Sequence, residues 1–108
     1  MKPVYYFWNS PQDYEVMCGA MAEHVAKMRC QEGNENIWFL QHVPLYTKGA
    51  GCQDLVPATL PFPLYRSTRG GKMTFHGPGQ RIIYVMIDLK RRTLSVHDYI
   101  FLLEQWVI

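Results

Sequence analysis

The chain has 108 residues, is 48% hydrophobic and carries a formal net charge of +2 at pH 7. This charge is too small to indicate binding to nucleic acid or to a membrane surface. The absence of a transmembrane run or a secretory leader, with three cysteines that lack paired or metal-ligand spacing, predicts a soluble cytoplasmic protein without a metal site.

A strand and a long helix are predicted at the start of the chain. Residues 4–8 are a short apolar and aromatic run, as in a strand. Ser10 is suited to cap the helix, because Pro11 then takes the first helical position and Asp13 completes a capping box. The apolar residues that follow helical spacing are Tyr14, Met17, Cys18, Met21, Val25 and Met28. Gly33 is expected to end the helix.

Strands and loops are predicted for the middle of the chain. We expect a turn at residues 34–36, a strand at 37–43, a loop at 47–61 and a strand at 62–67. Residues 81–89 are almost continuously apolar, which is typical of a strand covered on both faces. Because strands and helices do not alternate strictly, the pattern predicts an α/β or α+β fold, with helices packed on a mixed sheet.

A second helix is predicted after Ser95. Ser95 can cap the free N–H groups, and Asp98 lies three residues on, as in a capping box. Apolar residues then recur at Val96, Ile100, Leu103 and Val107, with Leu102 and Trp106 widening the stripe. No helix-ending signal precedes Ile108. We therefore expect residues 1–108 to be a truncated, N-terminal part of one larger domain.

Residues 69–84 carry most of the functional information, because their glycines and polar residues are too irregular for a packing element. Gly70 and Gly71 would let a ligand lie against the main chain. Thr74 and His76 have the same parity, so on an extended segment their side chains project to one side. These features predict a binding site.

This segment resembles the signature of the octanoyltransferases, also called lipoate-protein ligase B. The shared pattern is Arg-Gly-Gly-x-x-Thr, an aromatic residue and His-Gly-Pro-Gly-Gln, followed by an apolar strand that contains Tyr84. Residues 37–49 are similar to a second family stretch, in which Gln41 replaces the usual glutamate and Leu45 the usual valine. Residues 96–108 resemble a family helix.

The resemblance implies the fold of the biotin and lipoate protein ligases and an acyltransferase that needs no cofactor. Such enzymes take an octanoyl group from acyl carrier protein and hold it on a cysteine. They then pass it to a lysine of a lipoyl domain, in 2-oxoacid dehydrogenase complexes or the glycine cleavage H protein. The substrate-binding residues that the resemblance implies are Arg69, Gly70, Gly71, Lys72, Met73, Thr74, Phe75 and His76.

The family's nucleophilic cysteine and its assisting lysine lie in a C-terminal portion that has no match here, so we expect the chain alone to be inactive. Cys18 is expected in the core and Cys30 near the end of the first helix. Cys52 lies in a loop and is the one cysteine expected to be exposed enough to react. We assign no catalytic cysteine, and Lys72 is not expected to replace the family's lysine.

Several of these residues also have a purely structural interpretation. Arg69 can pair with a surface carboxylate, and Phe75 is most simply a core residue. His76 outside the motif would be structural, but inside it is expected to line a ligand or orient a partner. Packing and substrate contact are equally open for His42. Tyr84 is expected to be structural, with a partner for its hydroxyl.

Two other functions stay open. The first is an ATP-dependent lipoate or biotin ligase that forms an acyl adenylate, and the second is a non-catalytic protein that binds an acyl group or a carrier protein. The basic cluster at residues 90–92 is either a solvated turn or a landing point for an acidic partner.

Overall fold

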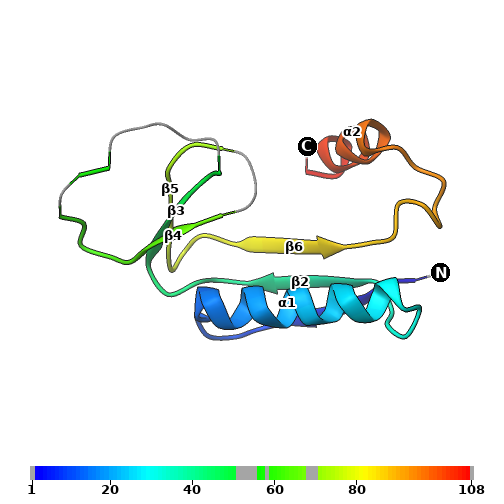
Figure 1. Ribbon diagram of the computed structural model, residues 1–108, viewed down its shortest axis with the longest axis horizontal. Helices are drawn as coiled ribbons and strands as arrows, with labels where there is room; N and C mark the ends of the chain where they lie inside the picture. The colour runs from blue at the N-terminus through cyan, green and yellow to red at the C-terminus, as the bar shows by residue number, and fades with distance from the viewer. Residues whose placement is uncertain (1, 51–55, 58, 68–70, 108) are drawn as a thin grey trace.

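The computed structural model describes residues 2–50, 56–57, 59–67 and 71–107 (Figure 1). Its elements, in chain order, are β1 (Val4–Phe7), α1 (Tyr14–Arg29), β2 (Asn36–Leu40), β3 (Leu45–Lys48), β4 (Leu64–Arg66), β5 (Thr74–His76), β6 (Ile82–Met86) and α2 (Val96–Val107). The described strands form two mixed, three-stranded sheets. The predicted α+β class, with a helix packed on a mixed sheet, is therefore confirmed.

One sheet has the strand order β1-β2-β6, and α1 covers one of its faces (Figure 1). β1 and β2 are parallel and are joined through α1, whereas β6 runs antiparallel to β2. Because alternate residues of a strand face the same side, every second residue of β2 is buried under the helix. The buried core consists of Met17, Met21, Trp38, Leu40 and Met86.

The opposite face of this sheet is partly exposed. The rings of Phe7 and Phe39 stack on it with centroids 4.7 Å apart, yet Phe7 keeps 65% of its surface in water. Ile83 of β6 is 37% exposed. The prediction of a strand over 81–89 covered on both faces is therefore wrong. β6 ends at Met86, and α2 does not seal the face, since none of its residues is buried.

The second sheet has the order β4-β3-β5 and holds the glycine-rich segment. β3 is parallel to β4 and antiparallel to β5, with Thr47 opposite Thr74 and Leu45 opposite His76. The predicted strand at 62–67 is confirmed as β4. The predicted loop over 47–61 is wrong at its start, because pairing on both sides makes residues 45–48 a strand.

The start of α1 differs from the sequence prediction, because Asp13 rather than Ser10 is the cap. The Asp13 carboxylate accepts a hydrogen bond from the Val16 N–H at 3.1 Å. Gln12 cannot be helical, since its N–H donates to the Gln41 carbonyl at 2.7 Å and its own carbonyl accepts from Val43 at 3.1 Å. This pairing with the end of β2 delays the helix to Tyr14.

The other helix ends follow local rules with one exception. α1 ends at Arg29, before Gly33, where we expected the helix to end, and Gln31, with φ of 59°, adopts the left-handed conformation. The capping box of α2 is confirmed, since Ser95 Oγ accepts from the Asp98 N–H at 3.0 Å and Asp98 Oδ2 from the Ser95 N–H at 3.3 Å. Within the described residues, neither helix is long and apolar enough to cross a membrane.

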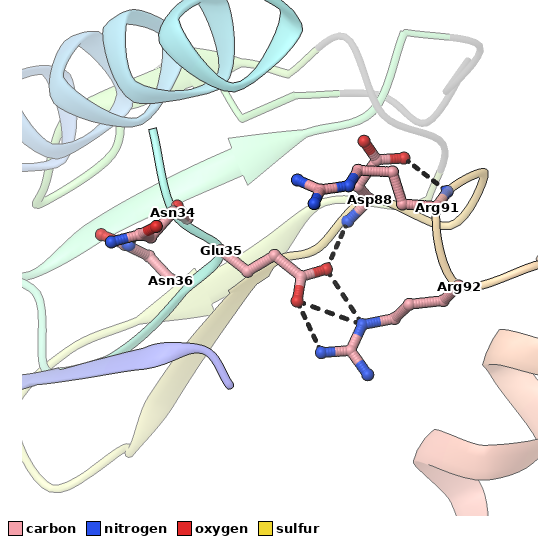
Figure 2. A network of polar contacts seen from close by, with 6 residues as sticks. All are labelled: Asn34, Glu35, Asn36, Asp88, Arg91 and Arg92. Carbon is pink, nitrogen blue, oxygen red and sulfur yellow. Dashed lines mark hydrogen bonds and ion pairs between the residues drawn. The ribbon is translucent and has the colours of Figure 1, made fainter. Parts of the chain in front are cut away.

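A buried carboxylate, Glu35, ties the start of β2 to the connection between β6 and α2 (Figure 2). It accepts hydrogen bonds from Arg92 Nε at 3.0 and 3.1 Å, from Arg92 Nη2 at 2.5 Å and from the Asp88 N–H at 2.7 Å. The bond from Arg92 is the main reason that the pKa of Glu35 lies below its ordinary value. Since Arg92 is engaged in this pair, the basic cluster at 90–92 does not offer three free cations.

Candidate functional site

A groove of about 1420 Å³ runs between α1, β6 and the second sheet. α1 lines it with Tyr14, Glu15, Cys18, Met21, Ala22, Val25, Ala26 and Arg29. The opposite side consists of residues 81–87, which include all of β6. The end near the second sheet is more polar and includes Thr47, Ser67, Thr74, His76 and Gln80. The groove therefore joins a largely apolar channel to a polar end.

Four of the eight residues that the resemblance implied line this groove. They are Gly71, Lys72, Thr74 and His76. Met73 and Phe75 do not line it, and Arg69 and Gly70 lie outside the described residues. Thr74 and His76 thus share one side of β5, as their parity predicts, with Phe75 between them facing away.

His76 is held by hydrogen bonds at both ring nitrogens. Gln80 donates from its amide nitrogen to the Phe75 carbonyl at 3.4 Å, so its amide oxygen accepts from His76 Nδ1–H at 3.0 Å. The Thr47 hydroxyl then donates to His76 Nε2, also at 3.0 Å. This arrangement orients the imidazole and the threonine hydroxyl at the polar end of the groove, and it suits a positioning role better than proton transfer.

Phe75 lies on the other side of β5 and is 45% exposed, so its prediction as a core residue is wrong. Its ring packs against the rings of Tyr46 and Phe62, with centroids 5.4 and 5.9 Å away. A Cβ at Gly77 would lie 2.8 Å from Phe75 Cζ. The glycine therefore lets the ring fold back over the turn.

The turn after β5 is anchored to β2 by Gln41. Gln41 Oε1 accepts a hydrogen bond from the Gly79 N–H at 2.9 Å, and Gly79 has the left-handed φ of 92° that glycine tolerates. An amide oxygen fills the same acceptor role as a carboxylate oxygen. A glutamate at position 41 would offer the Gly79 N–H the same kind of acceptor.

His42 is fully buried behind the groove wall, so the structure favours packing over substrate contact for this residue. Its Nδ1 lies 3.0 Å from the Gln12 carbonyl, which can only accept, so Nδ1 carries the proton. Nε2 therefore accepts from the Tyr84 hydroxyl at 2.7 Å, which confirms the predicted partner for that hydroxyl. Burial lowers the pKa of His42, and the imidazole is neutral.

Charged side chains gather along the groove in unequal numbers. Among the described residues, four cations line it, Arg29, Arg66, Lys72 and Arg81, against the single carboxylate of Glu15. Such an excess, in a chain with a net charge of only +2, favours a ligand with an apolar part and an anionic part.

The described cysteines do not form a catalytic arrangement. Cys18 is half-buried and lines the groove, whereas Cys30 is exposed at the end of α1. Cys52, which we expected to be exposed, lies outside the described residues. In the part of the chain that the structure describes, no three side chains of the metal-binding types come together.

Known proteins resemble the chain over nearly its whole length. Residues 13–108 match the family model described as the lipoyl protein ligase A/B catalytic domain. A protein of Paramagnetospirillum magneticum named octanoyltransferase is 46% identical over 102 residues, which cover 93% of this chain and 48% of that protein.

Two further octanoyltransferases, by name, come from Nitrobacter winogradskyi and Rhodopseudomonas palustris. The first is 46% identical over 102 residues, covering 93% of this chain and 43% of the relative. The second is 44% identical over 100 residues, covering 93% of this chain and 39% of the relative. The chain thus spans less than half the length of these relatives.

Proposed function

The chain belongs to the lipoyl protein ligase A/B catalytic domain family, and we propose that it forms the acyl-binding part of an octanoyltransferase of lipoate biosynthesis. The family resemblance found in residues 69–84 is confirmed. In the proposed reaction, an octanoyl group moves from acyl carrier protein to a lysine of a lipoyl domain. The observation that supports this role most directly is the groove between α1 and β6, in which apolar side chains of the two elements line opposite sides and the end at Thr74 and His76 is polar.

The apolar part of the groove suits a medium-length acyl chain. Each methylene that leaves water contributes about 0.8 kcal/mol, so the six methylenes of an octanoyl group contribute up to about 5 kcal/mol. Met21, Val25 and residues 82–87 supply apolar surface on both sides. This contribution would let the groove bind the acyl chain through burial of its methylenes alone, while the thioester stays at the polar end.

The polar end would place the thioester beside the glycine-rich segment. Gly71 and Lys72 line this end, and we assign Arg69 and Gly70 to the same substrate-binding segment. Thr47 and His76 are fixed by their mutual hydrogen bond and can orient a polar group of the substrate. We assign Met73 and Phe75 to the segment as residues that shape it from the other side.

The nucleophile and its assisting lysine are proposed to come from sequence that corresponds to the rest of the relatives, because the chain spans less than half of their length. On this proposal, residues 1–108 are the N-terminal part of a single catalytic domain, and they bind the acyl group without transferring it. The donor and acceptor proteins would be an acyl carrier protein and a lipoyl domain.

A chimera tests this proposal. The matching segment of the Paramagnetospirillum magneticum relative is replaced by this chain, and octanoyl transfer from octanoyl-acyl carrier protein to a lipoyl domain is followed by intact mass. We expect transfer without ATP, and a drop of at least tenfold when His76→Ala is added. The same chimera with the exposed, groove-remote substitution Tyr5→Phe is the matched control. A folded chimera that transfers nothing, or that requires ATP, contradicts the proposal.

A further inference from the structure

Three tyrosines line the groove where its α1 side, its β6 side and the second sheet come together, and a buried histidine lies behind this tyrosine wall. Tyr14, Tyr65 and Tyr84 all line the groove, whereas His42 does not and has no exposed surface. The His42 ring meets Tyr14 edge-on at 5.4 Å and Tyr84 at 5.8 Å between centroids. Tyr14 in turn packs on Tyr65 at 5.2 Å. His42 therefore contacts the tyrosine wall from the side away from the ligand space.

We propose that His42 is a positioning residue for acyl binding, which fixes the wall formed by Tyr14, Tyr65 and Tyr84 and thereby the width of the groove. This inference rests on the proposed function, since the wall matters only if the groove holds an acyl chain. His42 does so from the junction of three elements. It follows β2, its Nδ1–H donates to Gln12 just before α1, and its Nε2 accepts from Tyr84 on β6.

The position requires a donor on one edge of a flat ring and an acceptor on the other. Gln12 offers a carbonyl, which only accepts, and that carbonyl also receives the Val43 N–H at 3.1 Å. Tyr84 directs its hydroxyl proton at Nε2, so its orientation depends on a neutral His42. Two tyrosine rings packed edge-on against the same imidazole cannot turn independently of it.

Two substitutions separate the two hydrogen bonds. In His42→Asn the amide nitrogen replaces Nδ1, which keeps the bond to Gln12 and removes the acceptor for Tyr84. In His42→Gln the longer side chain reaches the place of Nε2, which keeps the acceptor for Tyr84. Tyr84→Phe removes only the hydroxyl, and Tyr5→Phe makes the same change at a residue that is 55% exposed and outside the groove.

The readout is the dissociation constant of octanoyl-pantetheine for the 108-residue chain, measured by titration at pH 7.5 with the melting curve of each variant. Because one hydrogen bond is worth about 1 kcal/mol, we expect His42→Asn and Tyr84→Phe to weaken binding about fivefold. His42→Gln should restore affinity to within about twofold, and Tyr5→Phe should leave it unchanged. Equal affinity in all folded variants would overturn the inference.

A measurement on the unmutated chain tests the positioning role of His42 even if a variant fails to fold. The imidazole ¹⁵N spectrum should show a protonated Nδ1 and an unprotonated Nε2 for His42, and both signals should move when octanoyl-pantetheine binds. His24, which contacts the Asn34 carbonyl at 2.6 Å outside the groove, should not respond. A His42 with the proton on Nε2, or signals that stay fixed while groove residues shift, would refute the positioning role.

Failure of the proposed function gives a different result. In that case the unmutated chain does not bind octanoyl-pantetheine at all, whatever its His42 tautomer, and the positioning role for acyl binding falls with it. Binding that is indifferent to His42 and Tyr84 leaves the proposed function standing and removes only this inference.

Discussion

Replacing Arg92 with methionine tests whether the buried Glu35 carboxylate needs its guanidinium partner. The Glu35 side chain is 2% exposed and that of Arg92 31% exposed. Removing one partner of a buried ion pair costs about 3 to 5 kcal/mol. Because Arg92 keeps some contact with water and the Asp88 N–H still bonds to Glu35, we expect a smaller loss, of about 2 to 3 kcal/mol.

Urea denaturation at pH 7 and at pH 4 measures this loss, with Glu35→Gln/Arg92→Met as the matched control. The double variant removes the stranded charge, so it should be more stable at pH 7 than Arg92→Met by at least about 1 kcal/mol. At pH 4 the single variant should approach wild type, since burial without Arg92 favours a protonated Glu35. A single variant within about 0.5 kcal/mol of wild type at pH 7 would show that Glu35 does not need its guanidinium partner.

The other outcomes concern pH, the glycine turn and the thiols. The free energy of unfolding should fall on acidification below about pH 6.5, because His42 binds a proton in the unfolded chain but not in the folded one, where its pKa is lowered. It should fall again below about pH 4.5, because Glu35, whose pKa is also lowered by folding, is protonated first in the unfolded chain. A urea midpoint that stays constant from pH 7.5 to 5 would contradict the first step. Gly77→Ala should displace the Phe75 ring, whose Cζ would lie 2.8 Å from the new Cβ, and lower the free energy of unfolding by about 1 kcal/mol. In a Phe75→Ala background the same substitution should cost nothing. If the losses from the two substitutions add in the double variant, the clash is not the cause. Octanoyl-acyl carrier protein should leave the three cysteines of the chain unacylated by intact mass, and one singly acylated cysteine that turns over would oppose this expectation.

Local patterns in the sequence were sufficient for much of the fold. The helical spacing from Tyr14 to Met28 placed Met17 and Met21 in the core. The capping box at Ser95 and Asp98 joins residues within one helical turn, so it can be predicted from four consecutive residues. The parity of β5 likewise placed Thr74 and His76 on one side, because that geometry is a property of any strand.

Features that depend on distant pairing could not be predicted. Glu35 lay in a segment expected to be a turn, and its partner Arg92 is 57 residues away. His42 and Tyr84 are 42 residues apart, so the local sequence around either residue does not reveal that His42 accepts a hydrogen bond from Tyr84. The start of α1 shifted for the same reason, since the backbone of Gln12 pairs with the end of β2.

The position of Phe75 shows the limit of hydrophobicity as a guide to burial. The simplest interpretation of this aromatic residue was a core position, but alternation along β5 turns it away from the groove that Thr74 and His76 line. Its aromatic neighbours there, among the described residues, are Tyr46 and Phe62, and it stays 45% exposed. Which face of a strand is covered depends on the elements packed against it, and the strand's own sequence does not contain that information.

The location of a bound octanoyl group shows whether the groove between α1 and β6 is an acyl-binding site. Octanoyl-pantetheine is titrated into the ¹⁵N-labelled chain, and backbone amide shifts are mapped at saturation. We expect the largest shifts in β6, in the groove-facing side of α1 and at Thr74 to His76, with β1 unaffected. Shifts confined to α2 or to the exposed face around Phe7 and Phe39, with none in the groove, would contradict it.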